Sequence, residues 1–192
     1  MRLLVIVDTY VPERISAALQ MHDLRQGHVP TVVVPAPDLE QPWRIERVDG
    51  VEVLRVRTLR TKDIGRIRRA LAEWWLPYGL LRGLRASPLA DVPWDGLIWY
   101  SPSIFLGPIV KHLKRRWNCR AYLILRDLFP DWAVDAGVLR RNGPAYRWFK
   151  RVERQQYAIA DVIGVQTPAN VPLVRRDCPA GARIEVLNNW LA

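Results

Sequence analysis

The clearest fold signal in the sequence is Leu3-Leu4-Val5-Ile6-Val7-Asp8-Thr9-Tyr10. Its uninterrupted run of leucine and β-branched residues, ended abruptly by polar ones, predicts a strand that is buried on both faces, as in a parallel sheet. The same pattern recurs at Thr31–Val34, Leu97–Tyr100, Ala121–Leu125 and Val162–Val165. Stretches with helical periodicity separate these runs. The sequence therefore predicts a doubly wound parallel α/β sheet with helices on both faces.

Two further segments extend this sheet. Arg44–Val48 and Val51–Val56 alternate in polarity around Asp49-Gly50, a dipeptide that suits a tight hairpin turn, and predict an edge β-hairpin. Arg183–Leu187 predicts the last strand. We expect one domain over residues 1–187. Because no helical pattern follows this last strand, we expect residues 188–192 to begin an interdomain linker.

Composition narrows the class of protein. The chain has 192 residues, of which 49% are apolar and 25% charged, as in a globular domain. No run approaches the roughly 20 apolar residues that span a bilayer, and the first apolar run is too short for a signal peptide. Cys119 and Cys178 lack partners at metal-ligand spacing, so no metal site is expected. We expect a cytoplasmic or peripheral protein.

The net charge of +10 predicts attraction to a polyanion. A phosphate-bearing substrate, an anionic lipid surface and a nucleic acid all fit charge alone. The basic residues are scattered and form no nucleic-acid motif, which argues against nucleic acid.

A basic, tryptophan-bearing helix is expected from residue 64 onward. Its apolar residues recur at steps of three and four, and a kink is expected near Pro77. The predicted apolar face comprises Ile64, Ile67, Leu71, Trp74, Tyr78 and Leu81. Two interpretations remain open. The apolar face packs on the sheet with the arginines in solvent, or the helix lies in a membrane interface. In the second case the contacts would be Arg66, Arg69, Trp74 and Trp75.

Ligands of open parallel sheets bind beyond the carboxyl ends of the strands, so the loops there carry the candidate site. In the first loop, Arg14 and Ser16 could contact a phosphate or could be surface and capping residues. In the second, Tyr100, Ser101 and Ser103 could contact a substrate, or the serines could cap a helix over 104–117.

The third loop follows the strand that ends at Leu125 and joins an arginine to three carboxylates with aromatic residues between them. Such a cluster can bind a sugar through its hydroxyl groups and its apolar ring faces. The candidates are Arg126, Asp127, Asp131 and Asp135. Alternatively, Asp131 caps the next helix and Arg126 pairs only with Asp127.

Several blocks of the chain resemble the N-terminal domain of family-4 glycosyltransferases of the GT-B fold, a Rossmann-like domain. The most specific are Tyr100-Ser101-Pro102-Ser103, Leu125-Arg126-Asp127-Leu128-Phe129-Pro130-Asp131 and Ala160-Asp161-Val162-Ile163-Gly164-Val165-Gln166-Thr167-Pro168. The chain is most similar to bacterial O-antigen and capsule enzymes of the L-fucosamine (N-acetyl-L-fucosamine) transferase type.

The resemblance implies a retaining, metal-independent enzyme without a cofactor. It would transfer a sugar from a nucleotide-sugar donor such as a UDP-sugar to a glycan on a polyprenyl diphosphate carrier. Asp127 and Arg126 would be the catalytic residues. Many relatives have a histidine where Arg126 stands, and arginine cannot act as a base, so it would stabilise charge near the diphosphate. Ile15-Ser16-Ala17-Ala18 replaces the glycines that many relatives carry in the first loop.

The resemblance also implies partners. The acceptor binds mainly to this N-terminal half, while the donor binds to a C-terminal domain that the 192 residues do not include. We therefore expect these residues alone to be inactive. The alternative is an acceptor-binding, membrane-side subunit of a two-subunit transferase. In either case we expect the protein on the inner face of the bacterial cytoplasmic membrane.

Overall fold

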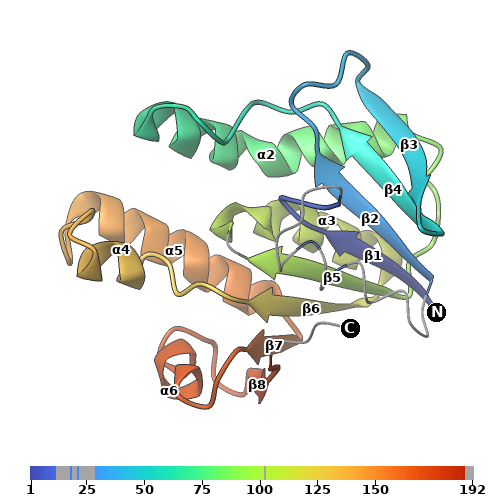
Figure 1. Ribbon diagram of the computed structural model, residues 1–192. Coiled ribbons are helices and arrows are strands. Elements are labelled where there is room, and N and C mark those ends of the chain that lie inside the picture. The colour runs from blue at the N-terminus through green and yellow to red at the C-terminus, as the bar shows by residue number, and fades with distance from the viewer. Residues whose placement is uncertain (12–17, 19–20, 22–28, 102, 189–192) are drawn as a thin grey trace.

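The computed structural model describes residues 1–11, 18, 21, 29–101 and 103–188, except for the side chain of Arg66. Eight strands form one sheet in the order β3-β4-β2-β1-β5-β6-β7-β8 (Figure 1). Their bounds are β1 Arg2–Ile6, β2 Val29–Pro35, β3 Trp43–Val48, β4 Val51–Val56, β5 Gly96–Ser101, β6 Arg120–Leu125, β7 Val162–Val165 and β8 Arg183–Val186. All neighbouring pairs are parallel except β3 with β4. The predicted doubly wound sheet is confirmed.

The central strands are buried on both faces, as the unbroken apolar runs predict. In β1, Leu4 and Ile6 join one core cluster, whereas Val5 joins the cluster on the opposite face, and all three side chains are fully buried. Val33 of β2 lies in the first cluster beside its register partner Ile6. Successive side chains of a strand point to opposite faces, so only a continuous apolar run can serve two cores.

The strand order reverses next to β1, which pairs with β2 on one side and β5 on the other. The chain thus winds first toward β2 and β4 and then, from β5 onward, in the opposite direction. Loops on either side of such a reversal diverge and leave a crevice beyond the carboxyl ends of the strands. This topology places the ends of β1, β5 and β6 together.

The predicted edge hairpin is also confirmed. β3 and β4 pair antiparallel from Trp43 opposite Val56 to Val48 opposite Val51. Asp49 and Gly50 have φ values of 48° and 83°. A two-residue turn of this kind needs positive φ at both positions, which Asp and Gly tolerate better than most residues.

The described helices are α2 Arg66–Ala86, the 3₁₀ helix η1 Ile104–Leu106, α3 Gly107–Trp117, α4 Asp131–Asp135, α5 Pro144–Ile159 and α6 Asn170–Arg175. The helix expected over 104–117 thus begins as a 3₁₀ turn. α2, α3 and α5 lie next to one another on one side of the sheet. In Figure 1 the N-terminal ends of α2 and α5 project past the strands, on the side to which β1, β5 and β6 point.

The face that α2 packs on the sheet differs from the one that the apolar spacing predicts. Ile67, Leu71 and Tyr78 of the predicted apolar face lie in solvent, with exposed fractions of 79%, 65% and 47%. The helix is buried instead through a second row, made of Ala72, Leu76, Leu80 and Leu84. Both rows recur at helical spacing, so periodicity alone cannot choose between them. Small residues beside the second row decide the choice because they let the helix come close to β4.

Candidate functional site

The candidate site lies beyond the carboxyl ends of β1, β5 and β6, at the reversal in strand order. Tyr100 and Ser101 are the last residues of β5, and Arg126 directly follows β6. The Arg126 backbone N–H donates to the Ser101 carbonyl at 3.3 Å, which extends the pairing of β5 and β6 up to the site. Asp8 stands just past β1 and is close enough to act electrostatically on Tyr100.

Arg126 is buried against Tyr100. Its guanidinium carbon lies 5.9 Å from the centre of the tyrosine ring, and only 8% of the residue is exposed. Burial lowers the pKa of Arg126, and the Tyr100 hydroxyl, which accepts a hydrogen bond from it, opposes that change. An arginine remains protonated even so. The sheet therefore holds a fixed positive charge at the mouth of the crevice.

Asp127 contributes a carboxylate beside this charge. Its side chain reaches solvent, yet the surrounding protein removes part of its hydration and raises its pKa. Burial likewise raises the pKa of Tyr100, with Arg126 opposing that change and Asp127 and Asp8 adding to it. Arg126, Asp127 and Asp8 each act electrostatically on Tyr100, so these four residues form one polar cluster. Such a cluster can bind hydroxyl groups and stabilise developing negative charge.

The two serines of the second loop have different surroundings. Ser103 caps η1, because its hydroxyl accepts a hydrogen bond from the Phe105 N–H at 3.4 Å. Ser101 is fully buried, and its hydroxyl has no hydrogen-bond partner among the described residues. The capping interpretation therefore holds for Ser103. Ser101 has no exposed surface through which a ligand could reach its hydroxyl.

Of the first loop, Arg14 and Ser16 lie outside the described residues. What the structure describes there is Thr9, which is buried and accepts a hydrogen bond from Lys62 at 3.2 Å. Lys62 follows β4 by several residues and thereby reaches back to the end of β1. This contact brings a second basic side chain to the same edge of the sheet.

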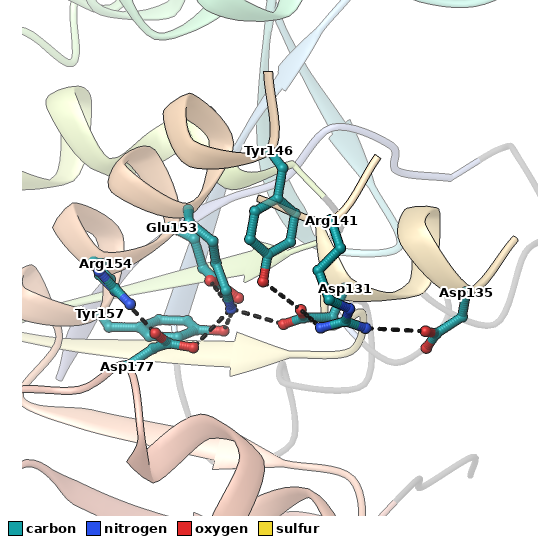
Figure 2. Close-up of polar contacts among 9 residues, drawn as sticks. Asp131, Asp135, Arg141, Tyr146, Glu153, Arg154, Tyr157 and Asp177 are labelled. Carbon is teal, nitrogen blue, oxygen red and sulfur yellow. Dashed lines mark hydrogen bonds and ion pairs between the residues drawn. The ribbon is translucent and has the colours of Figure 1, made fainter. Parts of the chain in front are cut away.

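Asp131, expected to bind substrate, takes part in a network beneath α4 and α5 (Figure 2), and 35% of its side chain remains exposed. Its carboxylate accepts hydrogen bonds from Lys150 at 2.7 Å and from Tyr146 at 2.8 Å. It begins α4 but makes no side-chain cap there. Both oxygens of Asp131 are therefore occupied within the protein. Asp135, at the other end of α4, is largely exposed and pairs with Arg141 at 3.3 Å.

Lys150 is the centre of that network. Its ammonium group also binds Glu153 at 2.7 Å and Asp177 at 2.6 Å. Burial by itself would lower the pKa of Lys150, but the hydrogen bonds to its three carboxylates outweigh burial and raise it. Asp177 follows α6, and Asp131 opens α4, so one ammonium group ties both of these segments to α5.

An aromatic cluster flanks the site on the helix side. Trp74 of α2 stacks on Trp148 of α5 with ring centres 5.2 Å apart and an angle of 16° between the planes. The ring centre of Phe105 in η1 lies 5.7 Å from that of Trp148, and the ring centres of Phe129 and Phe149 lie 4.8 Å apart. These ring contacts join α2, η1 and α5 to the loop that follows β6.

The expected membrane-contact residues of α2 divide into two groups. Trp75 is 59% exposed. Trp74 stacks one ring face on Trp148, and Arg69 forms an ion pair with Glu73 at 2.7 Å. Only the backbone of Arg66 is described, and it begins the helix. Within the described part of the chain, no helix has the length and apolarity needed to cross a bilayer.

No group of three or more metal-ligating side chains occurs among residues 1–11, 18, 21, 29–101 and 103–188. The expectation of a metal-independent reaction stays a prediction. Sequence reasoning missed Asp8 as a site residue, although its position directly after the first strand was a usable signal. It also missed Lys150 and Glu153, because nothing local on a helix reveals a partner that is distant along the chain.

Comparisons with known proteins bear on the fold. The chain matches no protein-family model and no curated protein sequence. It is similar to solved structures of GT-B glycosyltransferases. One is a sucrose-phosphate synthase from Thermosynechococcus elongatus, with 14% identity and a TM-score of 0.69. Another, titled trehalose-6-phosphate from E. coli bound with UDP-2-fluoro glucose, shows 14% identity and a TM-score of 0.66. A UDP-glucosyltransferase from Polygonum tinctorium shows 9% identity and a TM-score of 0.61.

These matches cover 97%, 98% and 100% of this chain. They cover 47%, 49% and 52% of the other chains, so this chain spans about half the length of the structures that it matches. At such low identity the likeness establishes the fold alone. The expected fold class, a Rossmann-like half of a GT-B fold, is confirmed.

Proposed function

We propose that this chain is the acceptor-side half of a retaining glycosyltransferase. The reaction would move a sugar from a nucleoside-diphosphate sugar to an acceptor hydroxyl. The observation that supports the proposal is the cluster of Tyr100, Arg126, Asp127 and Asp8 at the strand-order reversal of a GT-B-like half. The donor would be held by a second domain or a partner subunit, since the fold covers half of its structural neighbours.

Each residue of the cluster has a role in this proposal. Arg126, buried and charged, would contact the diphosphate of the acceptor and stabilise negative charge at the site. Asp127, with its raised pKa, would accept a hydrogen bond from the incoming hydroxyl and help to remove its proton. Tyr100 would position Arg126 through their hydrogen bond.

The finer part of the proposal concerns the acceptor. We infer a glycan on a polyprenyl diphosphate, as in O-antigen or capsule biosynthesis, with N-acetyl-L-fucosamine as the transferred sugar. The positively charged Arg126 at the site favours a diphosphate-bearing acceptor. The resemblance of the loops after β5 and β6 to the family-4 transferases supports the same acceptor class.

A binding experiment tests the acceptor assignment on the chain as it is. The probe is a water-soluble short-chain prenyl diphosphate saccharide, titrated calorimetrically. Replacing Arg126 by Gln should weaken binding about 10- to 100-fold, as expected when a charge-assisted contact to phosphate is lost. The matched control is Arg151→Gln on the exposed side of α5. Equal binding by both variants would refute the assignment.

Turnover tests the catalytic assignment. In the transferase assembled with its donor-binding half, Asp127→Asn should lower kcat about 100-fold or more while KM for the acceptor changes little. If kcat stayed at the wild-type value, Asp127 would not be catalytic. Full activity of the 192-residue chain without a donor-binding half would contradict the proposal that a second domain or subunit binds the donor.

We also propose a cytoplasmic protein that is attached peripherally to the inner face of the bacterial membrane through α2. The exposed Ile67, Leu71 and Trp75 on a basic helix support this attachment. Vesicles containing phosphatidylglycerol should pellet the protein, and pure phosphatidylcholine vesicles should not. Leu71→Ser should weaken pelleting, whereas Leu173→Ser, an equally simple change on the exposed face of α6, should not. Equal pelleting by both kinds of vesicle would exclude the electrostatic contribution.

A further inference from the structure

A groove of about 730 Å³ runs along α2, away from the crevice at β1, β5 and β6. One wall is α2, and the other is formed by the segment that follows β4 together with two prolines from the turn before β3. Its lining residues are Pro37, Pro42, Val56, Arg57, Thr58, Leu59, Ala72, Trp75, Leu76, Tyr78, Gly79, Arg82, Gly83 and Ala86. Its volume is in the range of small-molecule sites in proteins.

Small residues of α2 shape this groove. A Cβ at Gly83 would lie 2.3 Å from a methyl carbon of Val56, so glycine is required there for the helix to pack on β4. One turn earlier, a Cβ at Gly79 would meet only the Thr58 methyl, at 3.5 Å, which is ordinary contact. The helix is thus pressed onto the sheet at Gly83, and it leaves open space near Gly79. An extended hydrocarbon chain fits a channel lined in this way.

The rim of the groove is aromatic and half in solvent. Trp75 and Tyr78 are 59% and 47% exposed, and their ring centres lie 5.6 Å apart. Leu59, on the opposite wall, is 57% exposed. Amphipathic rings of this kind are typical of the boundary between hydrocarbon and headgroups. The exposed Ile67 and Leu71 continue the apolar surface along the same helix.

The charge in the groove has one sign. Arg57 and Arg82 are the charged residues among the described lining residues, and no carboxylate accompanies them. The Arg57 guanidinium donates one hydrogen bond to the Glu40 carbonyl at 2.7 Å, which orients it. A guanidinium has five N–H donors, so others remain for a phosphate. The groove is complementary to an amphiphile with an anionic head.

We infer that this groove binds one anionic phospholipid. The hydrocarbon chain lies along the face of α2 that contains Gly79, and the phosphate contacts Arg57 and Arg82 beneath the rings of Trp75 and Tyr78. The inference rests on the proposed attachment of α2 to a membrane and gives that attachment a specific lipid site. It differs from general surface attraction because it requires a single, saturable site.

Calorimetric titration with dioctanoyl phosphatidylglycerol below its micelle-forming concentration tests the site without a bilayer. We expect saturable binding of one lipid per chain, with dioctanoyl phosphatidylcholine and glycerol phosphate each at least about 10-fold weaker. Equal binding of the phosphatidylcholine would overturn the role of the arginines. Equal binding of glycerol phosphate would mean a phosphate site with no place for the hydrocarbon chain.

Two variants locate the site. Gly79→Leu should fill the groove and reduce lipid binding at least about 10-fold. It should not unfold the protein, because leucine favours a helix over glycine by about 1 kcal/mol. Arg82→Gln should reduce binding similarly, and the matched control is Arg68→Gln, which changes an exposed arginine of α2 outside the groove. Unchanged binding by Gly79→Leu and Arg82→Gln would overturn the inference.

The vesicle and turnover experiments separate this inference from the proposed function. If the wild-type chain shows no saturable binding of the soluble lipid while it still pellets with vesicles, the groove is refuted and membrane attachment stands. Saturable lipid binding in a chain whose assembled transferase has no activity would refute the enzymatic proposal and leave the groove standing.

Discussion

The ammonium group of Lys150 lies 2.7 Å from one carboxylate oxygen of Asp131, which ties α5 to the start of α4. This contact changes what is expected of Asp131. A carboxylate that binds a buried ammonium group and the Tyr146 hydroxyl stabilises the fold, a role beyond the substrate contact that the sequence predicts for it.

Asp131→Asn should therefore lower the free energy of unfolding by about 1–3 kcal/mol, because the buried Lys150 loses a charged partner. Asp135→Asn is the matched change at the exposed end of the same helix and should stay within about 0.5 kcal/mol of wild type. Urea unfolding of the three proteins measures both values. Equal stabilities would show that the network contributes nothing through Asp131.

The contribution of Asp177 should depend on pH. Burial would raise its pKa, but hydrogen bonds from Lys150 and Arg154 outweigh burial and lower it. A lowered folded-state pKa stabilises the fold above the ordinary aspartate value of about 3.9, and this stabilisation is lost as pH falls through the folded value. Asp177→Asn should thus be less stable than wild type at pH 7. The difference should shrink below pH 4, and urea midpoints at the two pH values would check it.

Gly164→Ala should destabilise the sheet by about 1–3 kcal/mol, through overpacking. The added Cβ would stand 2.3 Å from the Tyr122 hydroxyl, which donates to Glu185 at 2.9 Å across the strand that carries the glycine. Gly65→Ala is the control, because nothing lies within 4 Å of its Cβ position and its φ is −59°. Thermal unfolding of both variants is the measurement. Equal melting temperatures would mean that Tyr122 moves aside at no cost.

The stacked pair of Trp74 and Trp148 should couple α2 to α5. A double-mutant cycle with alanine at both positions should give a coupling energy of about 0.5–1.5 kcal/mol, the range for stacked aromatic pairs. Replacing Trp75, which lies one residue away and faces solvent, should give no coupling with Trp148. A coupling energy near zero for the stacked pair would show that the contact is incidental.

Local sequence patterns predict the strands, the hairpin turn and the edge of the sheet where the site lies. Unbroken apolar runs identified the strands buried on two faces, Asp49-Gly50 identified the hairpin turn, and polar residues after Leu125 marked the crevice. These features are local, because backbone propensity and the period of side-chain direction depend on neighbouring residues.

Which surfaces and charges come into contact depends on the packing of distant segments. This packing turned Ile67 and Leu71 to solvent and buried a second row of α2, since Gly83 allows the close approach to Val56 that the other row does not. Packing also brings Asp131 into contact with Lys150 and places Arg126 against Tyr100 at the crevice. Such pairings depend on distances between segments far apart along the chain. Helical periodicity and strand alternation are properties of one segment, so they do not predict contacts between distant segments.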